Sequence, residues 1–220
     1  MTITIAVDGT AASGKGTLAK KLAAHFGFAY LDSGSLYRLT ALGVIESGGD
    51  PTNEADAVKA AHAIDPARAN DPAIRTDIVG QASSQVAAIP AVREALKAFQ
   101  KNFVANPGAP GAVIDGRDIG TVIAPEAAAK LFVDARPQVR AHRRWLELKS
   151  MGIDRDETAL LAEIVARDAA DRSRAVSPLK QAADAALLDT SDLAIDAAFD
   201  AALRLVKPRI EDALKARQGG

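Results

Sequence analysis

The stretch Ile3-Thr-Ile-Ala-Val7-Asp-Gly9-Thr-Ala-Ala-Ser-Gly14-Lys15-Gly-Thr17 decides the fold of this chain. Its first residues are apolar and β-branched, as a strand buried on both faces requires. Residues 9–15 have the phosphate-loop spacing G-x-x-x-x-G-K, and residues 18–25 are good helix formers. The glycines let successive backbone N–H groups face one concavity, and the following helix adds the positive end of its dipole. The stretch therefore predicts a strand, a phosphate-binding loop and a helix.

Lys15 is expected to place its ammonium group on the β- and γ-phosphates of a nucleoside triphosphate. The next residue is Gly16, so the hydroxyl that commonly ligates Mg²⁺ directly arrives one position late, at Thr17. Thr17 can still donate to a phosphate. The alternative is a strand–turn–helix connection whose glycines only turn the chain. Because strand, loop and helix follow one another in the required order, the sequence favours a nucleotide triphosphate site.

Composition excludes several other classes of protein. The chain has 220 residues, of which 48% are hydrophobic and 25% are charged, an ordinary globular composition. Its net charge of −1 differs from the strongly positive charge typical of a nucleic-acid-binding protein. Any positive electrostatic field is therefore local and suited to a small anion. The absence of cysteine excludes disulfides and thiolate chemistry, and three histidines give little basis for structural zinc. No apolar run approaches membrane-spanning length, so we expect a cytoplasmic protein with no membrane partner.

Strands alternate with helices along the chain, which predicts an α/β fold with a parallel sheet covered by helices on both faces. The strands are expected at 3–7, 27–31, 112–115, 128–133 and 186–189. The helices are expected at 18–25, 35–45, 53–63, 74–88, 91–104, 137–151, 157–168 and 195–216. We expect Thr52 or Asn53 to cap the third helix, Pro90 to separate two helices, and residues 65–72 to form a loop. Pro208 is a candidate bend in the last helix.

Polar residues follow the predicted strands at 9–17, 32–34, 115–118 and 134. Ligands bind at the carboxyl ends of the strands in such sheets, so these segments are expected to form the site. Positive charge comes from Lys15, Arg38, Arg117 and the Arg/Asp-rich segment 167–174. The alternative for Arg38 and for segment 167–174 is a solvated, salt-bridged surface. Asp115 is a candidate to orient Mg²⁺ through water, or to cap the next loop.

Over nearly its whole length the chain resembles the bacterial cytidylate kinases. The matching segments are Val7-Asp-Gly…Gly14-Lys-Gly-Thr17, Tyr30-Leu-Asp-Ser-Gly34…Tyr37-Arg38, Ala82-Ser-Ser-Gln-Val-Ala87…Pro90-Ala-Val-Arg-Glu-Ala-Leu96, Asp115-Gly-Arg-Asp-Ile-Gly-Thr-Val122, Arg140-Ala-His-Arg-Arg144 and Arg167-Asp…Asp171-Arg-Ser-Arg-Ala-Val176. The motif G-K-G-T at residues 14–17 is itself typical of nucleoside monophosphate kinases. The longer bacterial members carry a small β-sheet insert, which in this chain is reduced to residues 65–75.

The resemblance implies roles for individual residues. Those implied to hold the nucleoside monophosphate are Ser33, Arg38, Ser84, Arg93, Arg117, Asp118, Arg167, Asp171 and Arg174. Those implied to bind ATP are the loop residues Gly9, Thr10, Ala11, Ala12, Ser13, Gly14, Lys15, Gly16 and Thr17, with Arg143 and Arg144 from a mobile lid. The charges expected to act in catalysis are Lys15, Arg117, Arg167 and Arg174.

Three of these residues are implied to distinguish cytosine from uracil. Ser84 and Asp118 are the expected hydrogen-bond acceptors and Arg93 is the expected donor. The alternative for Ser84 and Arg93 is a helix–helix contact within 74–96.

The resemblance also implies one kinase domain of the P-loop type. Its core is expected at 1–34, 110–140 and 185–220, a monophosphate-binding region at 35–109, and a lid at about 143–178. The implied reaction is transfer of the γ-phosphoryl group of ATP to CMP or dCMP, with Mg²⁺ as the bridging ion and a monomer as the active form. The alternatives are a small-molecule kinase with another acceptor, such as UMP or an organic alcohol, and a non-catalytic nucleotide-dependent switch.

Overall fold

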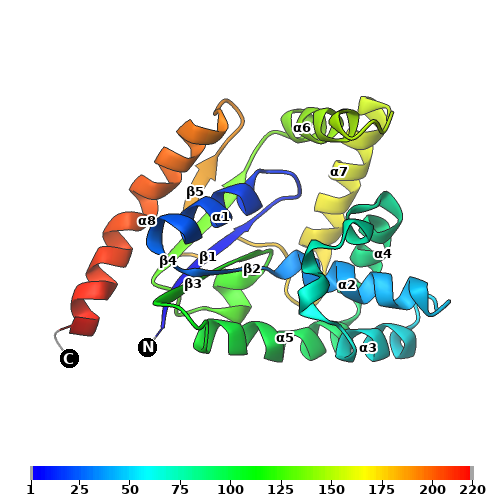
Figure 1. The fold of residues 1–220 in the computed structure, drawn as a ribbon. Helices are drawn as coiled ribbons and strands as arrows, with labels where there is room; N and C mark the ends of the chain where they lie inside the picture. Colours follow the sequence, from blue (N-terminus) through cyan, green and yellow to red (C-terminus); the bar gives the residue numbers. More distant parts are fainter. Residues whose placement is uncertain (1, 219–220) are drawn as a thin grey trace. The chain divides into compact units, whose positions relative to one another are not determined.

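The apolar run before the glycine-rich loop forms the central strand of the sheet. In the computed structural model, which describes residues 2–218, the described residues form a five-stranded sheet in the order β2-β3-β1-β4-β5 (Figure 1). β1 (Ile3–Gly9) pairs in parallel with β3 (Gly111–Gly116) on one side and β4 (Ala129–Asp134) on the other. β5 (Ala186–Asp189) pairs in parallel with β4, and β2 (Ala29–Asp32) is the opposite edge strand. The predicted α/β fold with a buried central strand is confirmed.

The described chain divides into two compact units, Met1–Leu31 with Val104–Gly220, and Asp32–Phe103. The first unit contains the glycine-rich loop, most of the sheet and the helices α1 (Lys15–Phe26), α6 (Pro137–Ser150), α7 (Glu157–Ser173) and α8 (Ile195–Gln218). The second unit contains α2 (Ser33–Glu46), α3 (Glu54–His62), α4 (Asp77–Ala88) and most of α5 (Pro90–Ala105).

Helices α1 and α8 cover one face of the sheet (Figure 1). Leu22 of α1 and Val206 of α8 belong to the same buried cluster as Ile5 and Val7 of β1. On the other face, Ala6 and Ile114 pack with a short π-helix, Ile119–Ile123, that follows β3. Burial of both faces explains why β1 reads as an almost uninterrupted apolar run.

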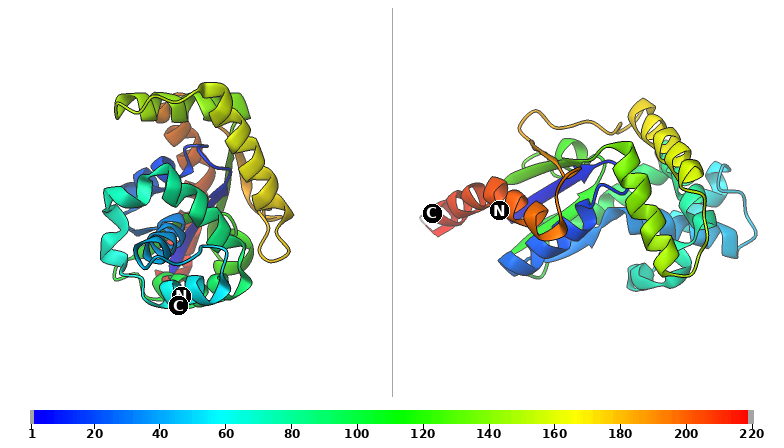
Figure 2. Two further views of the ribbon diagram at one scale, coloured as in Figure 1. Left: turned by 90° about the vertical axis from the view of Figure 1, so that its right-hand side faces the viewer. Right: turned by 90° about the horizontal axis from the view of Figure 1, so that it is seen from above.

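Helices α6 and α7 follow β4, and in Figure 2 α7 turns back from the end of α6. Pro137 occupies the start of α6, where a missing N–H costs no helical hydrogen bond. Asp156 caps α7 by accepting from the Ala159 N–H at 2.7 Å. α7 continues to Ser173, five residues beyond its predicted end at 168. The Arg/Asp-rich segment is thus helical over most of its length.

The second unit confirms two local predictions made from the sequence. Asn53, one of the two predicted caps, accepts from the Asp56 N–H at 3.1 Å at the start of α3. Pro90 is the first residue of α5, and the preceding Ile89 is extended at ψ 116°, as a residue before proline prefers.

Residues 65–72 differ from the loop that we predicted, and residues 74–76 from the start of the helix predicted at 74–88. They form two short 3₁₀ helices, Pro66–Asn70 and Pro72–Arg75. Asp65 and Asp71 cap these turns, each directly before a proline at the first helical position. Arg68 joins the segment to α2 through paired hydrogen bonds of 3.1 and 2.9 Å to Glu46. A capped Asp-Pro turn is too short to produce the helical periodicity that the sequence prediction relied on.

A further difference concerns Gly27. Predicted to begin the second strand, it instead ends α1 in a left-handed conformation at φ 66°. The last helix is as predicted: Pro208 lies inside α8, which continues past it. Within the described part of the chain, no helix is both long and apolar enough to cross a membrane.

Candidate active site

The glycine-rich loop leads directly into α1. Gly14 occupies the position before the helix at φ 88°, a left-handed conformation that favours glycine, and no side chain of the described residues caps the helix there. The first turn of α1 contains no acidic residue. Gly9 has φ 153°, and a Cβ at this position would lie 2.0 Å from the Val133 carbonyl oxygen. The glycines of the motif are therefore required by the backbone, and the start of α1 is open to an anion.

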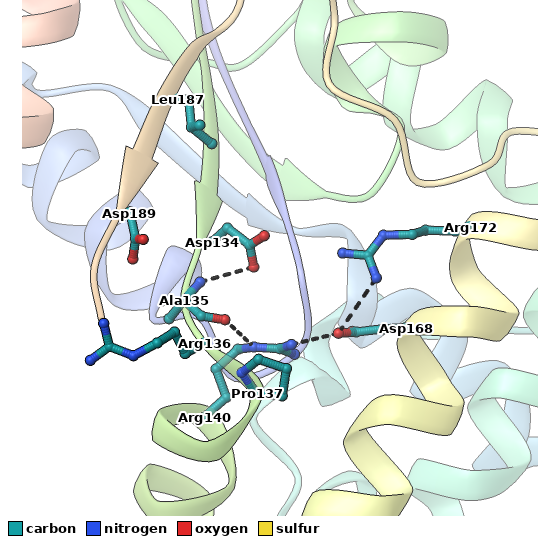
Figure 3. A pocket seen from close by; sticks show the side chains of 9 residues that line it. All are labelled: Asp134, Ala135, Arg136, Pro137, Arg140, Asp168, Arg172, Leu187 and Asp189. Atoms are coloured by element: carbon teal, nitrogen blue, oxygen red, sulfur yellow. Dashed lines mark hydrogen bonds and ion pairs between the residues drawn. The ribbon is translucent and has the colours of Figure 1, made fainter. Parts of the chain in front are cut away.

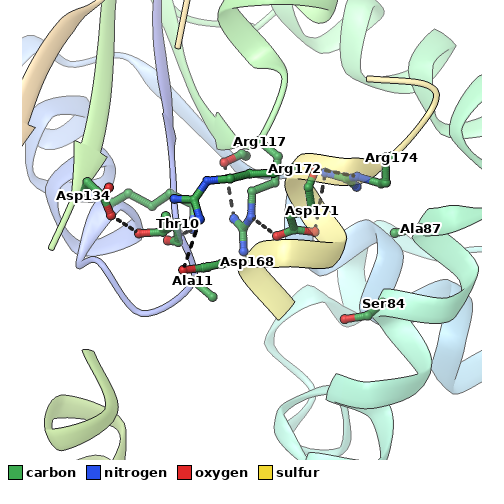
Figure 4. Close-up of polar contacts among 12 residues, drawn as sticks. Thr10, Ala11, Ser84, Ala87, Arg117, Asp134, Asp168, Asp171, Arg172 and Arg174 are labelled. Atoms are coloured by element: carbon green, nitrogen blue, oxygen red, sulfur yellow. Dashed lines mark hydrogen bonds and ion pairs between the residues drawn. The ribbon is translucent and has the colours of Figure 1, made fainter. Parts of the chain in front are cut away.

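Side chains around the loop fix its first half. The Thr10 hydroxyl donates to the Asp134 carboxylate at 2.6 Å, and Figure 4 shows the two side chains facing each other. Lys15, half-buried at the first position of α1, donates from Nζ to the Thr10 carbonyl at 3.4 Å. Ala12 lies at φ 58°, which is uncommon for a residue with a Cβ. The loop is thus held in a strained shape by its neighbours rather than by its own turn preferences.

The backbone carbonyls of the loop are also held from outside. Arg140 of α6 donates to the Ala11 carbonyl at 3.0 Å. The hydroxyl of Thr190, the residue after β5, donates to the Ser13 carbonyl at 2.9 Å. Neither Arg140 nor Thr190 was among the site residues predicted from the sequence.

Asp115 lies beside the start of α1. One carboxylate oxygen accepts from the Tyr30 hydroxyl at 2.8 Å. The other would lie 3.7 Å from a Cβ placed on Gly16. Among residues 2–218 no group of three or more His, Cys, Asp or Glu side chains is arranged to hold a metal ion. A buried carboxylate beside the phosphate loop suits a Mg²⁺ ion that takes most of its ligands from water and phosphate, so the residues present fit that ion.

Asp8, at the end of β1, is a buried carboxylate to which the sequence prediction gave no role. Its two oxygens accept from the backbone N–H groups of Ile119 and Gly120 at 2.8 and 2.7 Å. Asp8 therefore holds the start of the segment after β3. Burial raises the pKa of Asp8 to about 6, against the opposing effect of the two N–H groups.

The raised pKa of Asp8 predicts a pH-dependent stability. Folding favours the protonated carboxyl, so the contribution of Asp8 to stability is complete below about pH 3.8 and is lost as the pH rises to about 6. We expect the wild-type advantage in unfolding free energy over Asp8→Asn to fall by about 2–3 kcal/mol between pH 4 and pH 7. Urea unfolding of both proteins across this range measures it. An advantage that does not change with pH would contradict the buried ionisable role of Asp8.

Arg117 and Asp171 form the central ion pair of the candidate site. Arg117, directly after β3, donates from Nε to Asp171 of α7 at 2.8 Å, as Figure 4 shows. Arg174 approaches the other oxygen of Asp171 at 3.5 Å. Burial alone would raise the pKa of Asp171, but the charges of Arg117 and Arg174 outweigh it and hold this pKa below its ordinary value. The charge of half-buried Arg167 acts on Asp171 in the same direction.

The structure therefore brings Arg117, Arg167, Asp171 and Arg174 together, as their predicted shared role requires. Asp118, next to Arg117, is buried, and its carbonyl accepts from the Val122 and Ile123 N–H groups at 2.8 and 3.3 Å. The alternative of a solvated surface does not describe Asp171 or Arg174, whose side chains are only 12% and 10% exposed. It does describe Arg172, whose side chain is 51% exposed.

The two arginines predicted to reach ATP from the lid lie on α6. Arg143 donates to the Thr190 hydroxyl at 3.1 Å and to the Thr190 carbonyl at 2.6 Å. Arg144 donates to Glu147, one turn further along the helix, at 2.9 Å. Their contact with ATP stays a prediction.

A pocket of about 280 Å³ lies between β4, β5, α6 and α7 (Figure 3). Arg140 and Asp168 stand at its wall, joined by a 2.5 Å ion pair in which both side chains are almost fully buried. The residues that line the pocket are Asp134, Ala135, Arg136, Pro137, Arg140, Asp168, Arg172, Leu187 and Asp189.

The second unit carries the remaining predicted residues. Ser33 is buried at the first position of α2, and Arg38 of the same helix donates to the Ile74 carbonyl at 2.6 Å. Ser84 of α4 is half-buried, with its hydroxyl 3.5 Å from the Gly80 carbonyl. Arg93 of α5 donates to the Ala87 carbonyl at 3.4 Å. The helix–helix contact considered as the alternative is therefore present for Arg93, and contact of these residues with a base stays a prediction.

Comparison with known proteins agrees with this geometry. The cytidylate kinase family profile matches residues 5–208. A cytidylate kinase of Rhodopseudomonas palustris is 55% identical over 203 residues, covering 92% of this chain and 95% of that protein. One from Bradyrhizobium sp. is 54% identical with the same coverage, and one from Nitrobacter winogradskyi is 53% identical with the same coverage.

Two solved structures share the fold at low sequence identity. An uncharacterized protein from Eubacterium ventriosum is 14% identical with a TM-score of 0.51, covering 93% of this chain and 98% of that one. A sugar kinase from Janibacter sp. is 15% identical with a TM-score of 0.50, covering 96% of this chain and 98% of that one. The family profile and the relatives, which extend over nearly the whole chain, lead to one conclusion: this chain belongs to the cytidylate kinase family.

Proposed function

We propose that this protein transfers the γ-phosphoryl group of ATP to the 5′-phosphate of CMP or dCMP, giving ADP and CDP or dCDP. The observation that carries the proposal is the arginine group around Asp171, which belongs to the same unit as the open phosphate loop. An acceptor that already bears a phosphate needs such positive charge. An alcohol acceptor would need a carboxylate base instead.

The chemistry requires little of the protein beyond charge and position. The attacking oxygen belongs to a phosphate that is already anionic near neutral pH, so no general base is needed. As the phosphoryl group passes between the two nucleotides, negative charge spreads over its oxygens. Lys15, Arg117, Arg167 and Arg174 neutralise this charge and thereby lower the barrier.

The binding residues follow from the family resemblance. ATP phosphates bind to the loop residues 9–17, and Arg143 and Arg144 contact ATP from the lid. The residues that the resemblance implies for CMP binding are Ser33, Arg38, Ser84, Arg93, Arg117, Asp118, Arg167, Asp171 and Arg174. The assignment of one catalytic domain with a monophosphate-binding region at 35–109 and a lid at about 143–178 is part of the same proposal.

Mg²⁺ is the proposed metal ion, held through water by Asp115 and Thr17. It supplies charge neutralisation between the phosphate groups of ATP. We also propose that the protein acts in the cytoplasm as a monomer, without a nucleic-acid partner.

An assay of ADP release across the common nucleoside monophosphates tests the proposed function. We expect ADP to form rapidly with CMP and dCMP, slowly with UMP, and hardly at all without an acceptor. Release of ADP at one rate with and without CMP would instead indicate a nucleotide-dependent switch. Faster release with another acceptor would show that the substrate is wrong.

The segment from Arg143 to Arg174 is predicted to close over bound nucleotides as a lid. The like charges of its arginines would favour an open segment if they repelled one another until phosphates entered between them. Arg144, Arg172 and Arg174 instead each lie within 4 Å of a carboxylate, at 2.9, 3.9 and 3.5 Å, so charge repulsion does not supply the reason. Closure then has to come from phosphates that compete for these arginines. Limited proteolysis should cut the segment in the free protein and spare it with a bisubstrate analogue of ATP and CMP. Equal cutting rates would contradict the lid.

A further inference from the structure

Two peptide groups of the phosphate loop are held by side chains from distant parts of the same unit. Arg140 of α6 holds the carbonyl of Ala11 at 3.0 Å, and Thr190, after β5, holds the carbonyl of Ser13 at 2.9 Å. These partners are 129 and 177 residues apart in sequence. The loop sequence alone therefore does not determine the direction of these peptides.

Peptide geometry links these carbonyls to the N–H groups that would face a phosphate. In a trans peptide the C=O and N–H bonds point in opposite directions, and no described peptide bond is cis. With the Ala11 carbonyl directed to Arg140, the Ala12 N–H points the other way. Likewise, the Ser13 carbonyl is directed to Thr190, so the Gly14 N–H points away from Thr190. N–H groups of one loop that converge on the same side form an anion-binding concavity.

Burial and hydrogen bonds restrain the Arg140 side chain. It is 1% exposed, donates from Nε to the Ala135 carbonyl at 2.7 Å, and pairs with Asp168 of α7 at 2.5 Å (Figure 3). A buried guanidinium with fixed acceptors on three sides has little rotational freedom. It therefore presents one N–H to the Ala11 carbonyl in a defined direction.

Thr190 is held in the same manner. It is 2% exposed, and its hydroxyl accepts from Arg143 at 3.1 Å while Arg143 also donates to its carbonyl at 2.6 Å. Arg143 can only donate to the Thr190 hydroxyl oxygen, so the proton of this hydroxyl is donated to a backbone carbonyl instead. The Ser13 carbonyl at 2.9 Å is closer than the Asp134 carbonyl at 3.3 Å.

We infer that Arg140 and Thr190 are positioning residues for the triphosphate: they orient the Ala12 and Gly14 N–H groups toward it by holding the carbonyls of the same peptides. The inference rests on the proposed function only in taking a polyphosphate as the ligand of the loop. Arg143 supports this arrangement through Thr190, in addition to its proposed contact with ATP.

A matched pair of variants tests the inference at Thr190. Thr190→Val has nearly the same shape and lacks the hydroxyl, whereas Thr190→Ser keeps the hydroxyl. By calorimetry we expect Thr190→Val to bind inorganic tripolyphosphate and ATP roughly tenfold more weakly than wild type, and Thr190→Ser to stay within about twofold. In steady-state assays the KM for ATP should rise in Thr190→Val while the KM for CMP is unchanged. A purely structural role would lower the active fraction and leave both KM values unchanged.

Equal tripolyphosphate binding by wild type and Thr190→Val would overturn the inference, as would failure of the wild type to bind tripolyphosphate. Should Thr190→Val not fold, amide NMR of the wild type decides. Adding tripolyphosphate should shift the Ala12 and Gly14 amide resonances most, and unshifted resonances would overturn the inference. These binding readouts need no phosphoryl transfer. A wild type that binds tripolyphosphate through these amides but does not phosphorylate CMP would refute the proposed function and leave the inference standing.

Discussion

Replacing Lys15 with methionine is expected to lower kcat/KM for CMP phosphorylation roughly a thousandfold, with the fold intact. Methionine is close to lysine in length and favours helix, so α1 should form as before. The lost group is the ammonium at the first position of α1, where Nζ lies 3.4 Å from the Thr10 carbonyl. This charge is expected to meet the β- and γ-phosphates, where transition-state charge develops.

The matched control for this change is Lys20→Met. Lys20 is an exposed residue on the same helix, with its ammonium 5.6 Å from the Tyr30 ring. Its replacement should leave kcat/KM within about twofold, because surface lysines of this kind contribute little. Circular dichroism and thermal unfolding of both variants check the fold. Retention of more than a tenth of wild-type turnover by Lys15→Met would mean that Lys15 does not clamp the phosphates.

The second large effect is expected in the choice of base. Cytosine donates from its 4-amino group and accepts at the adjacent ring nitrogen, whereas uracil does the reverse at both positions. Ser84 and Asp118 are the proposed acceptors for the amino group, and Arg93 is the proposed donor to the ring nitrogen. A site built on such contacts discriminates strongly, because the wrong base leaves buried polar groups unpaired.

Ser84→Ala combined with Asp118→Ala should therefore lower the CMP-to-UMP ratio of kcat/KM by at least about a hundredfold, mainly through lost CMP activity. Ser83→Ala is the matched control. The neighbouring Ser83 is buried, and its hydroxyl donates to the Gly80 carbonyl at 2.7 Å, so its removal should change stability rather than the ratio. Parallel loss of CMP and UMP activity in the double variant would show that Ser84 and Asp118 do not read the base.

The features that could be predicted from sequence are those with local causes. The strand, loop and α1 follow from residues within one short stretch, and the Asn53 cap and the Pro90 boundary depend on their immediate neighbours. The residues alone marked Arg117 and the Arg/Asp-rich segment 167–174 as sources of positive charge, with a solvated surface as the alternative for that segment. The family resemblance assigned both to the nucleoside monophosphate. The ion pair of Arg117 with Asp171 joins residues 54 positions apart, so the sequence pattern does not show it.

Asp8, Arg140 and Thr190 could not be found by this reasoning. Each contacts the site through backbone groups, which leave no pattern of residue types in the sequence. In the sequence, Arg140 is one of several arginines on a predicted helix. Its burial depends on the packing of α6 against α7, which the sequence does not show. The one available signal was for Asp8, a carboxylate that directly follows an almost uninterrupted apolar run in a strand expected to be buried on both faces.

The most direct test of phosphoryl transfer to CMP follows the γ-phosphoryl group itself. The protein is incubated with ATP labelled in the γ-phosphate, with CMP present or absent, and the nucleotides are separated. If the protein transfers this group to CMP, the label appears in the β-phosphate of CDP in amounts equal to the ADP formed, with little inorganic phosphate. Label recovered as inorganic phosphate, or ATP left unchanged in the presence of CMP, would contradict this transfer.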